Sequence, residues 1–234
     1  MKPVSMALFT IPEWKKIPFL VHGFGNKDWQ QADFEAHPQM RNFKLLFLRQ
    51  IHSDILHIVE DFPENVLAGD ALLTDRQDIL LVIKTADCLP VLIVDTKTKA
   101  LAAVHCGWRS ISQKLVRKVV KCLEEHFQCD PSSLLIAFGP CIGKDCYEVG
   151  EDVRKKFENR GLKNDVFLPH PQHAGKFYLD LRMATRHQLL DGGVKDSNIS
   201  SVDLCTHCEE SLFSYRRSQQ KEGRMLSFIG RSSS

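Results

Sequence analysis

Residues 79–110, which read ILLVIKTADCLPVLIVDTKTKALAAVHCGWRS, decide the fold of this 234-residue chain. They contain three short apolar runs, at Ile79–Lys84, Val91–Asp95 and Leu101–His105. The connections between such runs are short and polar, as at Thr96–Lys99, and leave no room for a crossover helix. The stretch therefore predicts strands joined as hairpins, in an antiparallel or mixed sheet.

Further strands and helices are predicted on both sides of this stretch. Strands are expected at Phe43–Leu48, Ile55–Val59, Ala71–Leu73, Leu134–Phe138, Phe177–Leu179, Ser201–Cys205 and Met225–Ile229. Helices are expected from Ile111 to His126, from about Glu151, and from Asp180 to Leu190. Many short strands with about three helices are typical of the α+β class. We predict one domain over residues 1–234, with mixed or antiparallel β-sheet layers flanked by helices.

The clearest of these helices begins beside an arginine. Ser110, followed three residues later by Gln113, is the pattern of a capping box. Arg109 would then lie one residue before the cap, near the unpaired backbone N–H groups of the helix. Such a helix start favours an anion, and phosphate is the natural candidate.

Composition favours a globular protein that acts on a small molecule. The chain is 43% hydrophobic and 26% charged, which is enough to form a full core. Lys and Arg number 31 against 29 Asp and Glu, for a formal net charge of +2, and no long block of like charge occurs. This balance argues against a nucleic-acid or acidic-membrane partner.

The sequence indicates a cytoplasmic location. The start, Met1–Thr10, lacks a convincing signal-peptide core, and no segment approaches the roughly 18 apolar residues of a membrane span. The 8 cysteines are too dilute for a disulfide scaffold. In the reducing cytoplasm their thiolates would be available as metal ligands.

Three of the potential metal ligands stand where apolar runs end, namely His52, Cys88 and His105. One thiolate and two imidazoles suit a borderline-soft divalent ion such as Zn²⁺, and three protein ligands leave a fourth position open. Any one of these residues alone is more often a buried core residue. Together they predict a catalytic metal site.

Two other motifs were weighed for chemistry. Cys205 and Cys208 form a lone C-x-x-C pair. Because no second pair stands at zinc-ribbon spacing and no βαβ pattern surrounds it, we interpret it as a structural coincidence. Tyr215 and Arg216 belong to a segment of paired arginines, which we assign to the edge of an anion site rather than to a solvated face.

Several blocks of the chain resemble the YfiH-like proteins, once named laccase-domain or polyphenol oxidase proteins and now associated with purine nucleoside phosphorylase activity. The blocks follow the family's order from Gln50 to Gly230. They are Gln50–His52, Gly69–Asp75, Thr85–Val91, Ala103–Arg109, Gly139–Gly143, Cys146–Gly150, Asp180–Leu181 and Phe213–Arg217.

The resemblance implies a zinc ion held by His52, Cys88 and His105, with copper as an alternative metal. It also implies phosphorolysis of adenosine, inosine and methylthioadenosine to the free base and a pentose 1-phosphate, with adenosine deamination as a side activity. On this basis we assign catalysis to Arg109, Glu148 and Asp87, and substrate binding to Gln50, Arg109, Tyr215 and Arg216. Glu148 would carry a proton and Asp87 would orient a ligand imidazole.

The chain departs from the family's usual residues at three positions, Cys106, Ser110 and Thr185. Cys106 is the most consequential of these, because a second thiol beside the metal would compete as a ligand or make the site sensitive to oxidation. The older laccase label fits poorly. A four-copper site needs His-x-His pairs, and the sequence has none.

A copper-binding polyphenol oxidoreductase remains an alternative, and three others are open as well. A sole deaminase is less attractive because the His-x-Glu and Pro-Cys-x-x-Cys pattern of zinc base deaminases is absent. A metal-free cysteine hydrolase would use Cys88 as nucleophile and His105 as base, which leaves His52 without a role. The third alternative is a metal-binding accessory protein without enzymatic activity.

Overall fold

The three apolar runs of residues 79–110 are all strands, but they divide between two sheets. β6 (Ile79–Thr85) lies in a five-stranded sheet, whereas β7 (Leu89–Val94) and β8 (Leu101–Cys106) form an antiparallel hairpin within a six-stranded sheet. This computed structural model describes residues 8–219 and 223–232, so the prediction for Met1–Thr10 falls mostly outside them.

Both sheets mix parallel and antiparallel neighbours, as predicted. The first sheet has the strand order β1 (Leu8–Phe9), β2 (Leu20–Gly25), β14 (Met225–Arg231), β6 and β3 (Lys44–Phe47). The second sheet has the order β13 (Ile199–Ser201), β9 (Leu135–Phe138), β7, β8, β5 (Ala71–Thr74) and β4 (Leu56–Ile58). The pairs β3–β6, β4–β5 and β9–β13 are parallel, and the other pairs are antiparallel.

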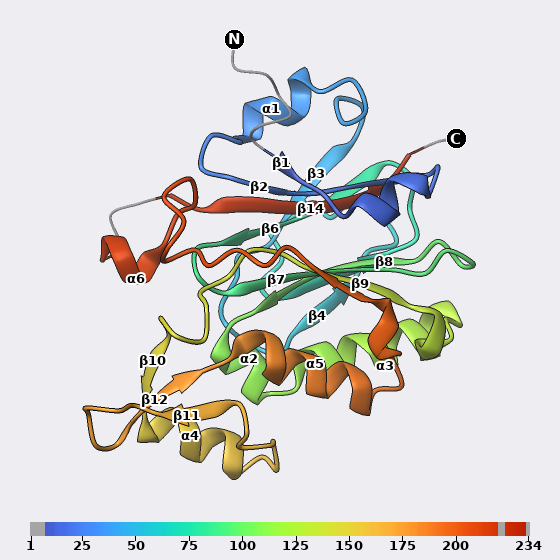
Figure 1. Cartoon of the computed structure of the whole chain (residues 1–234). Coiled ribbons are helices and arrows are strands. Elements are labelled where there is room, and N and C mark those ends of the chain that lie inside the picture. The colour runs from blue at the N-terminus through green and yellow to red at the C-terminus, as the bar shows by residue number, and fades with distance from the viewer. Residues whose placement is uncertain (1–7, 220–222, 233–234) are drawn as a thin grey trace.

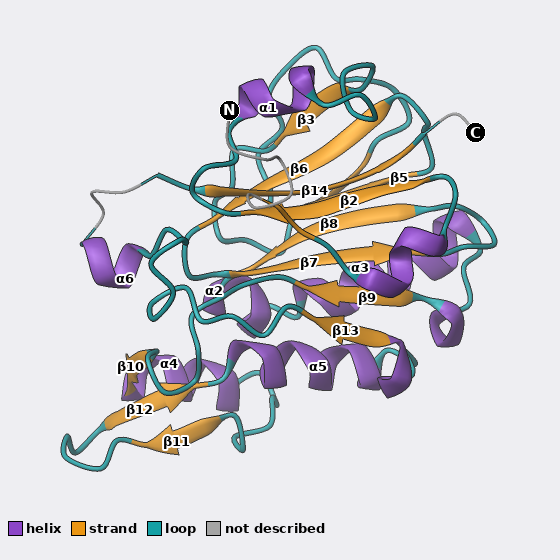
Figure 2. Cartoon of the chain, turned by 45° about the horizontal axis from the view of Figure 1, so that its top comes forward, coloured by secondary structure: helices purple, strands orange, loops and turns teal. Residues whose placement is uncertain are grey.

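The two sheets are stacked, with helices on both outer sides (Figures 1 and 2). α1 (Gln31–Ala36) covers the first sheet, and α2 (Trp108–Ser112), α3 (Leu115–Phe127) and α5 (Leu181–Asp191) cover the second. A small third sheet with α4 (Glu151–Glu158) extends from one end. Its strands are β10 (Glu148–Gly150), β12 (Lys176–Leu179) and β11 (Phe167–Pro169), and α6 (Tyr215–Ser218) lies at the same end of the molecule. The predicted α+β architecture is confirmed.

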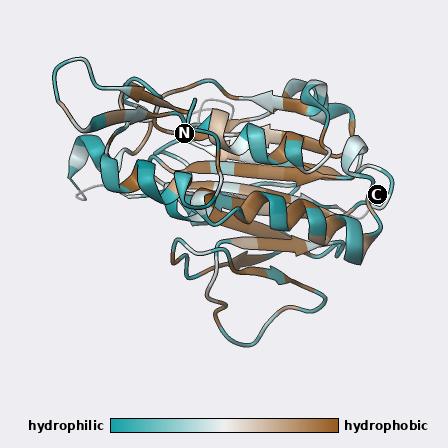
Figure 3. Cartoon of the chain, turned by 90° about the horizontal axis from the view of Figure 1, so that it is seen from below, coloured by the Kyte–Doolittle hydropathy of each residue, from teal (hydrophilic) through white to brown (hydrophobic). Residues whose placement is uncertain are grey.

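The second sheet is buried on both faces, which explains why its strands read as continuous apolar runs. Side chains alternate between faces along a strand. Leu92 and Ala103 belong to the core between the two sheets, whereas Val91, Ile93 and Val104 belong to the core under the helices. In Figure 3 the long strands are largely hydrophobic, while the helices combine hydrophobic and hydrophilic residues.

The helix predicted from Ile111 to His126 is interrupted. α2 ends at Ser112, Lys114 takes a left-handed backbone conformation with φ 61°, and α3 then begins at Leu115. The carbonyl of Ile111 accepts hydrogen bonds from the backbone N–H of Lys114 at 2.8 Å and from the buried side chain of Gln188 at 2.7 Å. The side chain of Gln188, on α5, thus occupies the carbonyl of Ile111, which in an unbroken helix would accept a hydrogen bond from the backbone N–H four residues further on.

The predicted start of this helix is also wrong. Gly107 is the N-cap residue of α2, so Arg109 and Ser110 lie inside the helix. The strand predicted at Ser201–Cys205 is displaced as well, since β13 ends at Ser201, and only an isolated bridge joins Cys205 to Cys141. None of the helices in the described parts of the chain is both long enough and apolar enough to cross a membrane.

His22 on β2 gives this fold a specific sensitivity to acid. Its Nε2 accepts a hydrogen bond from the backbone N–H of Ile11 at 3.0 Å, and burial together with the nearby Lys15 lowers its pKa to about 4. Between pH 6.5 and about 4, the unfolded chain therefore carries a proton on the imidazole of His22 that the folded chain does not bind. Stability from this residue is fully present above pH 6.5 and is lost as the pH falls through that window.

We expect the wild-type chain to lose about 3 kcal/mol more unfolding free energy between pH 7 and pH 4 than a His22→Gln variant. Glutamine keeps an acceptor for the N–H of Ile11 but does not titrate. Urea unfolding of both proteins at the two pH values measures the difference. Equal losses in the two proteins would contradict this assignment.

Candidate metal and substrate site

Cys88 and His105 lie at the same end of one hairpin. In the register of β7 and β8, Leu89 pairs with Cys106 and Pro90 with His105, so the residue just before β7 reaches the end of β8. The strand that precedes Cys88 in the sequence is not the partner of β8. That strand, β6, belongs to the other sheet.

Strand alternation separates Cys106 from this site. Cys106 is fully buried in the core under the helices, on the opposite face of β8 from His105. Burial raises the pKa of its thiol, and the charges of Cys88 and Asp70 raise it further. Cys106 is therefore a core thiol, and its predicted competition as a metal ligand is wrong.

His52 comes from a loop that is folded around the fully buried carboxylate of Asp70. The backbone N–H groups of Ile51, His52 and Ser53 donate to this carboxylate at 3.3, 3.0 and 2.6 Å, and the Ser53 hydroxyl donates at 2.7 Å. These bonds hold His52 in the left-handed region at φ 57°, a conformation that costs a non-glycine residue about 1 kcal/mol or more.

The same carboxylate orients the second imidazole. Nδ1 of His105 donates to Oδ1 of Asp70 at 2.7 Å, which leaves Nε2 for the open side of the site. Burial would raise the pKa of Asp70, but the hydrogen bonds from His105 and Ser53 outweigh it and lower the pKa to about 2. One buried charge thus sets both the loop of His52 and the ring of His105.

The ligand atoms of His52, Cys88 and His105, which we call the His–Cys–His cluster, lie within 4.8 Å of one another. Sγ of Cys88 is 3.9 Å from Nε2 of His52. Burial would raise the pKa of Cys88, but the neighbouring His105 and His52 lower it to about 6, so the sulfur is held as a thiolate. Cys88 and Asp70 in turn overcome the effect of burial on His105 and raise its pKa to about 9.

Glycine is required behind the cluster. A Cβ atom at Gly107 would lie 3.0 Å from Cδ2 of His52 and 3.1 Å from Sγ of Cys88. The cluster is therefore packed against backbone on one side. A thiolate and two imidazoles at this spacing fit a transition-metal ion with a free coordination position.

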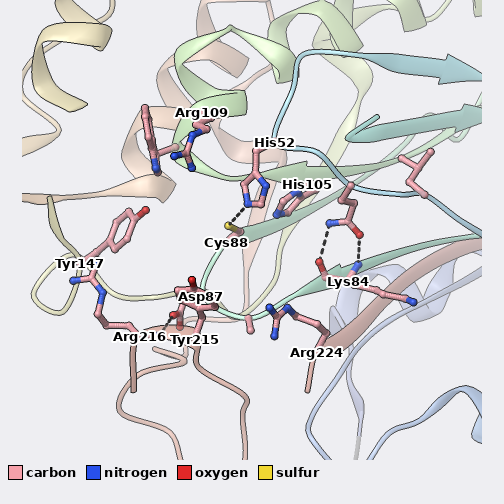
Figure 4. A pocket seen from close by; sticks show the side chains of 14 residues that line it. His52, Lys84, Asp87, Cys88, His105, Arg109, Tyr147, Tyr215, Arg216 and Arg224 are labelled. Atoms are coloured by element: carbon pink, nitrogen blue, oxygen red, sulfur yellow. Dashed lines mark hydrogen bonds between the residues drawn. The ribbon is translucent and has the colours of Figure 1, made fainter. Parts of the chain in front are cut away.

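The cluster opens into a cavity of about 540 Å³ (Figure 4). Among the described residues, its walls carry four cationic side chains and three aromatic rings, but only one carboxylate, that of Asp87. The cationic residues are Lys84, Arg109, Arg216 and Arg224, and the aromatic residues are Trp108, Tyr147 and Tyr215. Such a cavity suits an anion together with a flat ring.

The arginines are positioned by the rings. The guanidinium carbon of Arg109 lies 4.5 Å from the ring centroid of Trp108, and that of Arg216 lies 5.3 Å from the centroid of Tyr147. Arg216 also donates to the carbonyl of Glu148 at 2.9 Å. Cation–π contacts of this kind fix the direction of a long side chain.

Gln50 and Asp87 line the cavity, but their polar groups are already engaged. The amide of Gln50 makes two 2.8 Å hydrogen bonds with the backbone of Lys84. The carboxylate of Asp87 accepts from the hydroxyl of Thr206 at 2.6 Å and from the backbone N–H of Arg216 at 2.7 Å. The prediction that Asp87 orients a ligand imidazole is wrong for His105, because Asp70 does so.

Glu148 is not among the residues that line the cavity. Its carboxylate faces His170, His173 and Lys176 on the small sheet, at 3.5, 3.3 and 3.5 Å. The predicted role of Glu148 as a proton carrier in this cavity is therefore wrong. Only its backbone carbonyl takes part, through Arg216.

Sequence reasoning missed Asp70 and Tyr147. Both stand inside blocks that carry the family resemblance, yet nothing in their spacing indicates a role. The hydroxyl of Tyr147 projects into the cavity (Figure 4), and burial raises its pKa, so it remains a hydrogen-bond donor.

The fold and the site define a layered α+β protein with a metal-capable pocket for an anion and an aromatic ring. The chain belongs to the family described as multi-copper polyphenol oxidoreductase laccase, whose model matches residues 28–232. Within the described residues, no group of candidate ligands contains more than two histidines.

Named relatives point to purine nucleosides. A purine nucleoside phosphorylase of Clostridium acetobutylicum is 36% identical over 204 residues, 83% of each chain. An adenosine deaminase from an unknown prokaryotic organism is 34% identical over 200 residues, 80% of this chain and 75% of its own. The crystal structure of the hypothetical protein YfiH of Bacillus licheniformis matches with a TM-score of 0.86 at 26% identity, over 96% of both chains.

Proposed function

We propose that this chain is a zinc-dependent purine nucleoside phosphorylase. It cleaves adenosine, inosine and methylthioadenosine with phosphate to the free base and a pentose 1-phosphate, and it deaminates adenosine as a side reaction. The observation that carries the proposal is the cationic cavity lined with aromatic rings beside the His–Cys–His cluster. The names of two relatives, a purine nucleoside phosphorylase and an adenosine deaminase, support a purine nucleoside as the substrate.

In this proposal His52, Cys88 and His105 hold the metal. When bound, a zinc ion supplies Lewis acidity, which polarises a substrate oxygen or lowers the pKa of a water molecule. Asp70 keeps Nε2 of His105 available for the metal by accepting the proton of Nδ1.

The side chains around the cavity bind the two substrates. Arg109 and Arg216 hold the phosphate through charged hydrogen bonds, and Tyr147 donates a further hydrogen bond from its hydroxyl. The helix start at Gly107 adds little, because α2 has only five residues. A phosphate oxygen attacks the anomeric carbon of the sugar as the bond to the purine breaks, and the proton that the hydrogen phosphate gives up ends on the ring nitrogen of the departing purine. The phosphate charge and the arginines stabilise this separation of charge.

Chromatography of the products tests the proposal. Adenosine with phosphate should give adenine and ribose 1-phosphate, and adenosine without phosphate should give only inosine. An Arg109→Met variant should raise the KM for phosphate about tenfold to hundredfold, since it removes a charged hydrogen bond. Methionine retains apolar contact with Trp108, and Arg117→Met on the exposed side of α3 is the matched control. The proposal fails if the metal-loaded protein releases no free base.

The geometry also favours one second candidate. Cys88, His105 and Asp70 stand in the order of nucleophile, base and orienting carboxylate, as in a cysteine hydrolase. This chemistry would not need His52. If a His52→Ala variant without metal cleaves a substrate by water as fast as the wild-type protein, the result would favour the hydrolase over the phosphorylase.

A further inference from the structure

A second group of thiols lies outside the cavity. Sγ atoms of Cys146, Cys205 and Cys208, which we call the thiol cluster, lie within 4.8 Å of one another, and those of Cys146 and Cys208 are 3.4 Å apart. Cys146 stands 59 positions before Cys205 in the sequence. Sequence spacing therefore gave no sign that its thiol lies beside those of Cys205 and Cys208, which we interpreted as a structural coincidence. The fold supplies the ligand that the sequence spacing lacked.

Two tight turns bring the thiols together. In one turn the backbone N–H of Cys146 donates to the carbonyl of Gly143 at 3.0 Å, and in the other the N–H of Cys208 donates to the carbonyl of Cys205 at 3.2 Å. The two segments run side by side from the bridge between Cys141 and Cys205 onward (Figure 1). The turns therefore present their sulfurs to a common point.

The surroundings of Cys205 favour the charged form of its sulfur. The backbone N–H of Gly143 donates to Sγ of Cys205 at 3.1 Å, and a Cβ atom at Gly143 would lie 3.2 Å from this sulfur. Backbone donors of this kind support thiolates that bind metals.

We propose that Cys146, Cys205 and Cys208 form a second metal site, which binds a thiophilic divalent cation such as zinc through three thiolates. Binding releases the protons of the thiols that are still protonated and leaves one coordination position for solvent. The partly exposed position of the cluster, with Cys208 at the surface, gives a metal access from solvent.

The site would stabilise the wall of the main cavity. Cys146 precedes Tyr147, which lines that cavity, and the turn after Cys205 holds Thr206, whose hydroxyl donates to Asp87 next to Cys88. An ion bound by the thiol cluster ties these two segments together. The second site is thus structural, and it does not depend on the reaction proposed for the cavity.

Metal titration of the reduced, full-length chain tests this inference. In a His52→Ala/Cys88→Ser background, which lacks two ligands of the His–Cys–His cluster, we expect about one equivalent of Zn²⁺ per chain and a Co²⁺ thiolate charge-transfer band. Cys205→Ser and Cys208→Ser should each abolish the band and the bound zinc. Cys122→Ser, at a partly buried cysteine of α3, should leave both unchanged.

In the absence of metal, the Cys208→Ser variant should keep the circular dichroism spectrum and melting temperature of its background protein, because Cys208 is exposed, and this would exclude unfolding as the cause of the loss. The inference is overturned if the background protein binds no zinc after reduction. It is also overturned if zinc binding persists in both serine variants.

Discussion

Replacing Asp70 by asparagine is expected to reduce metal affinity of the His–Cys–His cluster at least tenfold to hundredfold and to destabilise the fold by about 3 kcal/mol or more. The two carboxylate oxygens of Asp70 accept five hydrogen bonds from residues 51–53 and His105. An asparagine side chain has one acceptor oxygen, and its NH₂ group faces donors wherever it is placed. If the NH₂ group faces His105, the favoured tautomer carries its proton on Nε2, which then cannot bind a metal.

Metal content after dialysis against a chelator and urea unfolding measure these two effects. Asp95→Asn is the matched control, because Asp95 is also buried and accepts hydrogen bonds from Lys97 and Thr98 at the far turn of the β7–β8 hairpin. The control should lose stability but keep the wild-type metal affinity. Wild-type metal affinity in the Asp70→Asn protein would show that the carboxylate does not set the cluster.

Replacing Cys88 by serine is expected to lower phosphorolysis by about a hundredfold or more and to remove most of the metal from the cluster. A neutral hydroxyl replaces the thiolate, which is the softest ligand and the only negatively charged one of the three. A zinc ion that dissociates slowly can hide a loss of metal affinity. Activity is therefore measured over a range of added Zn²⁺ concentrations. A partial rescue at high Zn²⁺ concentration agrees with ligand loss.

Cys106→Ala is the control for Cys88→Ser, since Cys106 is a neighbouring buried thiol that faces the core. It should cost about 1 kcal/mol of stability for the small cavity and keep metal and activity. If Cys88→Ser retains full metal content and activity, the assignment of Cys88 as a ligand is wrong. Cleavage of a substrate by water that is lost in Cys88→Ser but retained without metal in His52→Ala would instead support the hydrolase.

Much of the fold could be predicted from local patterns. The apolar runs at Ile79–Lys84 and Leu101–His105 are strands because residues buried on both faces must be continuously apolar. By contrast, β2 contains Gly23 and Gly25, which depress strand propensity. Glycine is needed there because a Cβ atom would lie 2.6 Å from Leu8 or 2.9 Å from Trp29, a contact that only the folded chain reveals.

The helix predicted after His105 also depends in part on a contact that only the folded chain reveals. A helix was expected from Ile111 to His126, and α3 covers most of this range. The interruption at Lys114 could not be predicted, because it depends on a hydrogen bond from Gln188, which lies 77 positions from Ile111 in the sequence. Local helix propensity predicts that the segment is helical, but a residue distant in the sequence determines where the helix is interrupted.

The sequence by itself was enough to propose the kinds of metal ligand and the residues that would supply them. His52, Cys88 and His105 stand out because polar residues of these types end apolar runs, which local chemistry makes visible. Tertiary structure decided how they meet, because only the pairing of β7 with β8 puts Cys88 and His105 at one end of a hairpin. It also decided that Asp70 holds the cluster, that Glu148 faces the small sheet, and that Cys146 joins Cys205 and Cys208. Each of these depends on long-range contacts, whose partners are chosen by the packing of the whole chain and leave no local pattern.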